Sequence, residues 1–210
     1  IATPLLFILA LSVKETAVTF PLALLLWEIG CCGKWQANLK LLWPSWLVLL
    51  MGSLLFLFSD SYITQMQRSA ELNSLQGNAA TQLSAFAYLM GQWALPLWLN
   101  IDPDLALRTD FSGAFWPSLI FAGVLILMLL CWRRRPWVGF ALAWAILHLV
   151  PLYLFLPRLD IANDRQMYLT GWPLLLAVSI ELNIWLNGKM LRLAVVALLL
   201  ALSALTVLRN

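Results

Sequence analysis

The chain has 210 residues, of which 62% are hydrophobic and 11% charged, and its mean hydropathy is +0.85. Soluble domains are roughly 45–50% apolar and about 25% charged, so this composition excludes an ordinary soluble domain and predicts an integral membrane protein. The formal net charge of +3 is small and dispersed along the chain, which argues against nucleic acid as a partner.

Apolar runs that could cross a bilayer as helices recur along the chain. The first run is shorter than the roughly 20 residues that a spanning helix needs, and it starts with Ile, so we expect a fragment that begins inside a helix. The 84–99 run is short, carries Gln92 and is interrupted by Pro96, so it could span the membrane, re-enter it or lie in its interface. The other runs predict spans at about 1–13, 17–32, 40–59, 114–132, 137–156, 169–187 and 191–208.

The connections between these runs differ in charge. Residues 30–40, 131–136 and 186–192 carry Lys or Arg and no acid, which is typical of cytoplasmic loops. Eight of the ten acidic residues gather in 13–16, 59–113 and 157–168. The two sets lie on opposite sides of one membrane only if 84–99 does not cross it. We therefore expect one transmembrane domain over 1–210, with 84–99 re-entrant or interfacial and with 60–113 forming an extracytoplasmic loop.

Lys14 and Glu15 stand side by side between two apolar runs. A charge at the centre of a membrane helix costs at least about 2.5–3.5 kcal/mol, so such residues often mark a site or a paired structural group. The alternative is a lysine that snorkels from a helix end to the lipid headgroups, with Glu15 as its neighbour.

Two further segments bring polar residues to the same predicted face. In 81–105, Pro96 ends or kinks a helix, and Asp102 follows either as a surface carboxylate or as a helix cap before Pro103. In 157–172, a helix that begins near Asp164 would place Asp164 and Tyr168 on one face, with Arg165 beside them. Arg165 could clamp a phosphate or contact lipid headgroups, and Asp164 could cap the helix.

Three other groups are assigned no chemistry. His148 lies within a predicted span without an acid or a second His one turn away, and we interpret it as a hydrogen-bonded packing residue. Glu28 and Glu181 lie near the predicted cytoplasmic ends of their spans, where lysines are close in sequence. The three cysteines lack a metal-binding spacing, so no divalent metal is indicated.

Three motifs follow one another along the chain: K-E-x-x-x-T-x-P, then T-Q followed by Y, P and N-x-D, then an acid followed by R-x-x-Y-L. In this order they resemble the multi-spanning GT-C glycosyltransferases, in particular the transmembrane and tetratricopeptide-repeat O-mannosyltransferases and their bacterial homologues. The family commonly has Glu where Asp164 stands, and Pro-Ser where this chain has Thr170 and Gly171. The matching residues are Lys14, Glu15, Thr19, Pro21, Thr81, Gln82, Tyr88, Pro96, Asn100, Asp102, Asp164, Arg165, Tyr168 and Leu169.

The resemblance implies an all-α, GT-C-like membrane helix bundle in the bacterial inner membrane, active on its extracytoplasmic face. It implies an inverting transferase that moves a sugar from a polyprenyl- or dolichyl-phosphate donor to a protein hydroxyl, as in O-glycosylation, or to a glycan. No cofactor is implied, and a tetratricopeptide-repeat domain on the same full-length chain would fit the resemblance.

The same resemblance suggests roles for individual residues. Lys14 and Arg165 would bind the donor phosphate, because fixed cations stabilise the charge that develops on a leaving phosphate. The family's catalytic carboxylate lies in an extracytoplasmic loop near the N-terminus that this sequence lacks, so we expect the base outside it and the fragment alone to be inactive. Supporting or acceptor-side residues would be Glu15, Gln82, Asn100, Asp102, Asp160, Asp164 and Tyr168.

Two other classes of protein remain as alternatives. An oligosaccharide ligase or polymerase also uses polyprenyl-linked donors, and a large arginine-rich loop would favour it, but 59–113 holds only Arg68 and Arg108. A transporter or membrane scaffold would not be an enzyme. Transporters place ionisable groups or broken helices near the membrane midplane, whereas the ionisable groups here gather at one predicted surface.

Overall fold

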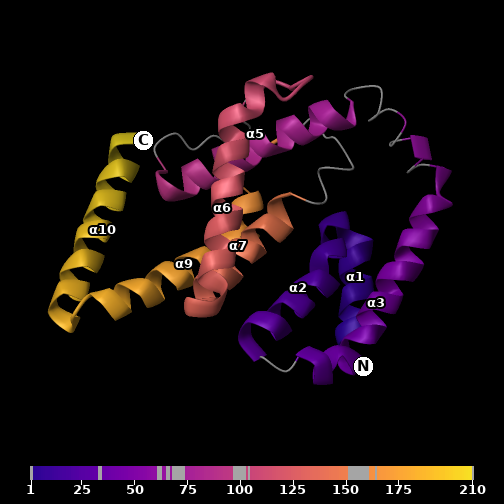
Figure 1. Cartoon of the computed structure of the whole chain (residues 1–210), viewed down its shortest axis with the longest axis horizontal. Coiled ribbons are helices and arrows are strands. Elements are labelled where there is room, and N and C mark those ends of the chain that lie inside the picture. The colour runs from indigo at the N-terminus through magenta and orange to yellow at the C-terminus, as the bar shows by residue number, and fades with distance from the viewer. Residues whose placement is uncertain are drawn as a thin grey trace.

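The structure is a computed structural model of the whole chain (Figure 1). Its described residues are 2–32, 35–60, 63–64, 67, 74–96, 103, 105–150, 161–163 and 165–209.

Within these ranges the regular structure is entirely helical, which confirms the predicted all-α class. Three helices are long and apolar enough to cross a membrane, namely Ser112–Arg134, Gln166–Trp185 and Gly188–Leu208, and they support a membrane protein. The helices are α1 (Ala2–Val13), α2 (Phe20–Trp27), α3 (Trp35–Leu57), α5 (Leu75–Ala94), α6 (Phe115–Arg134), α7 (Pro136–Leu149), α9 (Gln166–Trp185) and α10 (Gly188–Arg209), with short helical turns η1 (Glu15–Thr19), η2 (Glu28–Cys32) and η3 (Ser112–Ala114).

Helix α7 is central, since it packs against α2, α6 and α9. Its contact with α9 is made by small and aliphatic side chains, including Ala141 and Ala145 on α7 and Ala177 on α9. Inside a bilayer the hydrophobic effect does not drive helices together, and small residues stabilise their association by letting the backbones approach closely. At the turn into α7, a Cβ added to Gly139 would lie 2.9 Å from the Trp132 Cα of α6, so the α6–α7 hairpin depends on a glycine there.

Helix α5 covers Leu75–Ala94, whereas the apolar pattern predicts an element over 84–99. The helix begins after Ser74, whose side chain accepts from the Gly77 N–H at 3.0 Å, and it ends two residues before Pro96. Its first half is polar yet buried, which is why hydropathy alone places its start too late. The buried polar residues of α5 are Asn78, Thr81, Gln82 and Gln92.

The apolar face of α5 forms a second core with the segment that leads into α9. Phe86 and Leu89 are almost fully buried there, against Leu149 at the end of α7 and against Ile161 and Ala162. This packing fixes the chain immediately before α9, and thereby the position of the α9 N-terminus.

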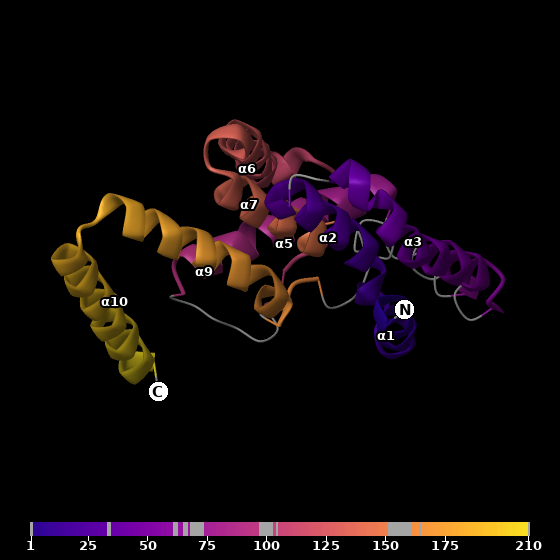
Figure 2. The same cartoon turned by 90° about the horizontal axis from the view of Figure 1, so that it is seen from below.

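The N-terminal helices α1, α2 and α3 lie together on one side of the molecule, and α10 lies at the opposite end, beyond α9 (Figure 1 and Figure 2). The predicted 17–32 span is divided into η1, α2 and η2. No residue in the apolar window of α10 is buried, although the helix contacts α9.

Candidate functional site

A cavity of about 720 Å³ lies between the N-terminal helices and the α7–α9 pair. Most of its wall is apolar and comes from α1, η1 and α2, with Phe7 and Ala23 among the lining residues. Lys14 contributes the positive charge, while Trp144 and His148 of α7 and Leu169 of α9 complete the opposite wall. Volumes of roughly 300–1,000 Å³ with a few polar groups are typical of small-molecule sites.

Lys14 lies at a sharp corner of the chain. Helix α1 ends at Val13, and Lys14 adopts an extended backbone conformation before η1 begins. The Thr19 hydroxyl donates to the Thr16 carbonyl oxygen at 2.9 Å, and Pro21 is buried at the start of α2. The Thr and Pro of the first motif therefore build the corner, and the lysine stands at the C-terminal end of α1, where a positive charge is favourable.

The opposite wall of the cavity is held rigidly. The Trp144 Nε1 donates to the Leu169 carbonyl oxygen at 2.9 Å, and the Trp144 ring meets Trp172 edge-on at 5.6 Å between centroids. His148 stacks on Trp144 with ring centroids 4.5 Å apart, and its Nδ1 lies 3.0 Å from the Trp144 carbonyl oxygen. His148 is thus hydrogen-bonded and packed, as the sequence predicts, and it also lines the cavity.

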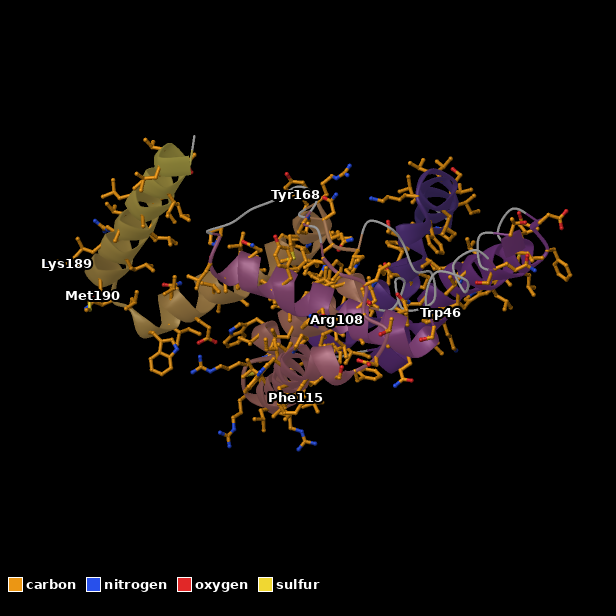
Figure 3. All side chains as sticks on the ribbon, turned by 90° about the horizontal axis from the view of Figure 1, so that it is seen from above. Trp46, Arg108, Phe115, Tyr168, Lys189 and Met190 are labelled. Carbon is orange, nitrogen blue, oxygen red and sulfur yellow. The ribbon has the colours of Figure 1, made fainter. Side chains whose placement is uncertain are left out.

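Helix α9 begins at Gln166, with Arg165 as its flanking residue. The buried Asn163 side chain accepts from the Arg165 backbone N–H at 2.9 Å and from its Nε at 3.1 Å, which fixes the guanidinium at the helix start. Leu169 faces the cavity one turn later. Tyr168 is 82% exposed and stands at the outside of the molecule (Figure 3).

The Thr-Gln pair of the second motif lies inside α5. Thr81 accepts from the Arg108 backbone N–H at 2.9 Å and donates to the Gly77 carbonyl oxygen at 2.8 Å, so it ties the segment before α6 to α5. Gln82 is 4% exposed and is absent from the cavity wall. Thr81 therefore holds α5 and the segment before α6 together, and neither residue of the Thr-Gln pair lines the cavity that contains Lys14.

Several predicted site residues cannot be placed relative to the cavity. The side chain of Glu15 lies outside the described part of the structure, although its backbone belongs to η1. Asn100, Asp102, Asp160 and Asp164 lie outside the described residues altogether. The described side chains include no group of three or more His, Cys, Asp or Glu residues that could hold a metal ion.

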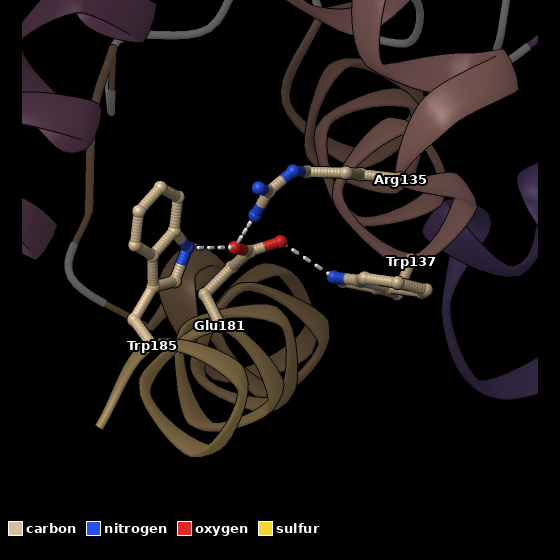
Figure 4. A network of polar contacts seen from close by, with 4 residues as sticks. All are labelled: Arg135, Trp137, Glu181 and Trp185. Atoms are coloured by element: carbon tan, nitrogen blue, oxygen red, sulfur yellow. Dashed lines mark hydrogen bonds and ion pairs between the residues drawn. The ribbon is translucent and has the colours of Figure 1, made fainter. Parts of the chain in front are cut away.

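A second polar cluster lies at the other end of the α7–α9 pair (Figure 4). Glu181 forms an ion pair with Arg135, and its two oxygens accept from the Nε1 atoms of Trp137 and Trp185, each at 2.9 Å. The Arg135 guanidinium also lies over the Trp185 ring, 5.2 Å from its centroid. The partner of Glu181 is thus an arginine at the α6–α7 junction rather than a nearby lysine.

Sequence reasoning missed the roles of Trp144, Asn163 and the Arg135–Glu181 pair. Asn163 gives a weak local signal, because an Asn side chain often accepts from the backbone N–H two residues further along the chain. The cavity role of Trp144 depends on a contact with α9 that no local pattern encodes. Comparison of the chain with protein-family models, curated proteins and solved structures found no match.

Proposed function

We propose that this chain is part of a GT-C-type membrane glycosyltransferase, which moves a sugar from a polyprenyl-phosphate donor to an extracytoplasmic acceptor. The main support for this proposal is the cavity, whose wall is mostly apolar and includes the charged side chain of Lys14. A polyprenyl phosphate combines the same two features, a hydrocarbon chain and an anionic head.

The position of the charge supports this assignment. Lys14 lies at the end of α1, while Phe7 and Ala23 line apolar parts of the cavity wall. A lipid chain would lie against those side chains, with its phosphate at the lysine. Lys is a compact point charge that suits a phosphate oxygen, and a fixed cation stabilises the negative charge that develops on a leaving phosphate.

The start of α9 supplies a second cation. Arg165 lies one helical turn before Leu169, which lines the cavity, and Asn163 holds its guanidinium in place. Arg165 itself is not among the cavity-lining residues. In the proposed enzyme it would meet the more exposed part of the donor head, near the acceptor, whereas Lys14 meets the phosphate.

The experiment measures transfer of a labelled sugar by the full-length protein in proteoliposomes, with polyprenyl-phosphate donors that differ in their hexose. We expect Lys14→Ala and Arg165→Ala each to lower the transfer rate at least tenfold, or about 1.4 kcal/mol of transition-state stabilisation. Lys14→Arg keeps the charge and should retain more activity than Lys14→Ala.

Lys189→Ala is the matched control, because Lys189 is an exposed lysine in the first turn of α10, at the other end of α9 (Figure 3). Its transfer rate should equal that of the wild type. Wild-type rates in Lys14→Ala and Arg165→Ala, at equal expression, would remove both residues from the site. Absence of transfer from every polyprenyl-phosphate donor by the wild type would contradict the proposed function.

A further inference from the structure

The imidazole of His148 is held in one orientation at the cavity wall. Its Nδ1 lies 3.0 Å from the carbonyl oxygen of Trp144, one turn earlier on α7, and its ring stacks on the Trp144 indole. Trp144 is itself tied to α9 through the Leu169 carbonyl oxygen. The histidine ring therefore has little freedom to turn.

This contact decides which ring nitrogen carries the proton. A carbonyl oxygen can only accept a hydrogen bond, so Nδ1 must be the donor, and in the neutral ring Nε2 then carries a lone pair. Nδ1 points back to its own helix, so Nε2, across the ring, points away from α7. Among the described residues Nε2 has no hydrogen-bond partner. His148 thus offers an acceptor to the cavity that it lines.

Lys14 and His148 therefore suit different parts of a ligand. The lysine ammonium can only donate, which suits an anion such as a phosphate. The Nε2 acceptor needs an O–H or N–H group, which an ionised phosphate diester does not supply. A ligand that satisfies both residues carries an anionic group and a hydroxyl within the reach of one cavity, as a sugar linked to a lipid phosphate does.

We propose that His148 Nε2 accepts a hydrogen bond from a hydroxyl of the donor sugar, so that the cavity distinguishes a glycosylated polyprenyl phosphate from a bare one. The inference rests on the proposed function. A site built to bond a hydroxyl discriminates strongly against an analogue that lacks it, because its own polar group is then left unpaired. Trp144 acts as a positioning residue, since its carbonyl oxygen and ring set the direction of Nε2.

The test measures the affinity of the full-length protein in detergent for two short-chain polyprenyl phosphodiesters of equal charge, one that carries a hexose and one that carries a methyl group in its place and serves as the bare lipid. The mannosyl, glucosyl and galactosyl forms are measured separately. His148→Asn keeps an N–H close to the position of Nδ1 but has no acceptor at Nε2. His148→Gln places a side-chain amide near the position of Nε2 and can still accept from a hydroxyl.

We expect the wild type to bind at least one hexosyl lipid tenfold or more tightly than the bare lipid. His148→Asn should lose this preference while its affinity for the bare lipid stays within twofold, and His148→Gln should keep most of the preference. Lys14→Ala should weaken binding of both lipids. Unchanged binding of the bare lipid also serves as the control that His148→Asn is folded.

The possible failures can be told apart. If the wild type binds both lipids but shows no preference, or keeps its preference in His148→Asn, the role of His148 is wrong and the proposed function is untouched. Equal weakening of both lipids by His148→Asn also overturns the sugar contact. If the wild type binds neither lipid, the proposed function fails, and this inference fails with it.

Discussion

The two ends of the antiparallel α7–α9 pair carry opposite kinds of polar chemistry. At one end, Glu181 is bonded to Arg135 and to two indole N–H groups, so its acceptor capacity is largely used within the protein. At the other end, Lys14 and His148 line a cavity, and no carboxylate among the described side chains pairs with Lys14. We call the end with Glu181 and Arg135 the closed end, and the end with Lys14 and His148 the open end.

The difference separates stabilising charges from charges available to a ligand. A polar group that is already paired contributes to stability, and its removal leaves its partner unsatisfied. A charge kept beside a cavity without a protein partner adds little to stability and is free to bind. We therefore expect substitutions at the closed end to lower stability, and substitutions at the open end to lower binding and transfer.

Removal of the Glu181 carboxylate should have the largest effect on stability. Glu181→Ala leaves Arg135 and both indole N–H groups without their acceptor, and we expect a loss of about 2 kcal/mol in unfolding free energy. Thermal unfolding in detergent measures this loss. Lys14→Ala is the contrast and should change the unfolding free energy by less than about 0.5 kcal/mol. Similar losses in both variants would erase the distinction between the two ends.

The α6–α7 hairpin carries Arg135 to the closed end, and its geometry depends on Gly139. Gly139→Ala would place a methyl group against the Trp132 backbone, so we expect a loss of about 1–2 kcal/mol from the forced shift of α7. Gly123→Ala on α6 is the matched control, since a Cβ there meets nothing within 4 Å. Equal melting temperatures for the two variants would show that the close approach is not needed.

Loss of a single indole donor should lower the unfolding free energy less than loss of the Glu181 carboxylate. Trp185→Phe removes one of the bonds to Glu181 but leaves the Arg135 ion pair and the Trp137 bond in place. We expect a loss of about 0.5–1.5 kcal/mol, smaller than that for Glu181→Ala. Unfolding of the two variants side by side tests the order. A larger loss for Trp185→Phe would mean that ring packing, and not the carboxylate, holds this end together.

The smallest expected effect on stability comes from Asp110, an exposed carboxylate before α6. The hydroxyl and the backbone N–H of Ser112 donate to Asp110 and lower its pKa. A lowered folded-state pKa means that this interaction stabilises the loop above the ordinary Asp pKa and is lost as the pH falls through the folded value. Ser112→Ala should raise the Asp110 pKa towards its ordinary value in a carboxyl NMR titration. An unchanged pKa would show that the hydroxyl contributes nothing.

The sequence predicts the long apolar helices well because their apolar residues are continuous. Predicted spans at 114–132, 169–187 and 191–208 correspond to α6, α9 and α10, each within three residues at both ends. The predicted 84–99 element starts later than α5 does, because Asn78, Thr81 and Gln82 in the first half of α5 are buried despite being polar. Their burial depends on packing against other segments, which hydropathy does not register.

The candidate site could be predicted only in part. The cost of a charge at membrane depth marks Lys14 as a candidate site residue, and in the structure Lys14 lines a cavity. The interpretation of His148 as a hydrogen-bonded packing residue is confirmed, but the sequence does not show that its partner is the Trp144 backbone or that it lines the cavity. Arg135 and Glu181 are far apart in sequence, so their contact follows only from the antiparallel packing of α7 and α9.

The most direct test of the open end is photocrosslinking of the full-length protein with a polyprenyl phosphate that carries a diazirine beside its phosphate. We predict that the label maps by mass spectrometry to the Lys14 corner and to α7 around Trp144 and His148. Excess unlabelled polyprenyl phosphate should suppress this labelling, and Lys14→Ala should reduce it. A label spread evenly over exposed helices such as α10, and unaffected by Lys14→Ala, would contradict a phosphate site at the open end.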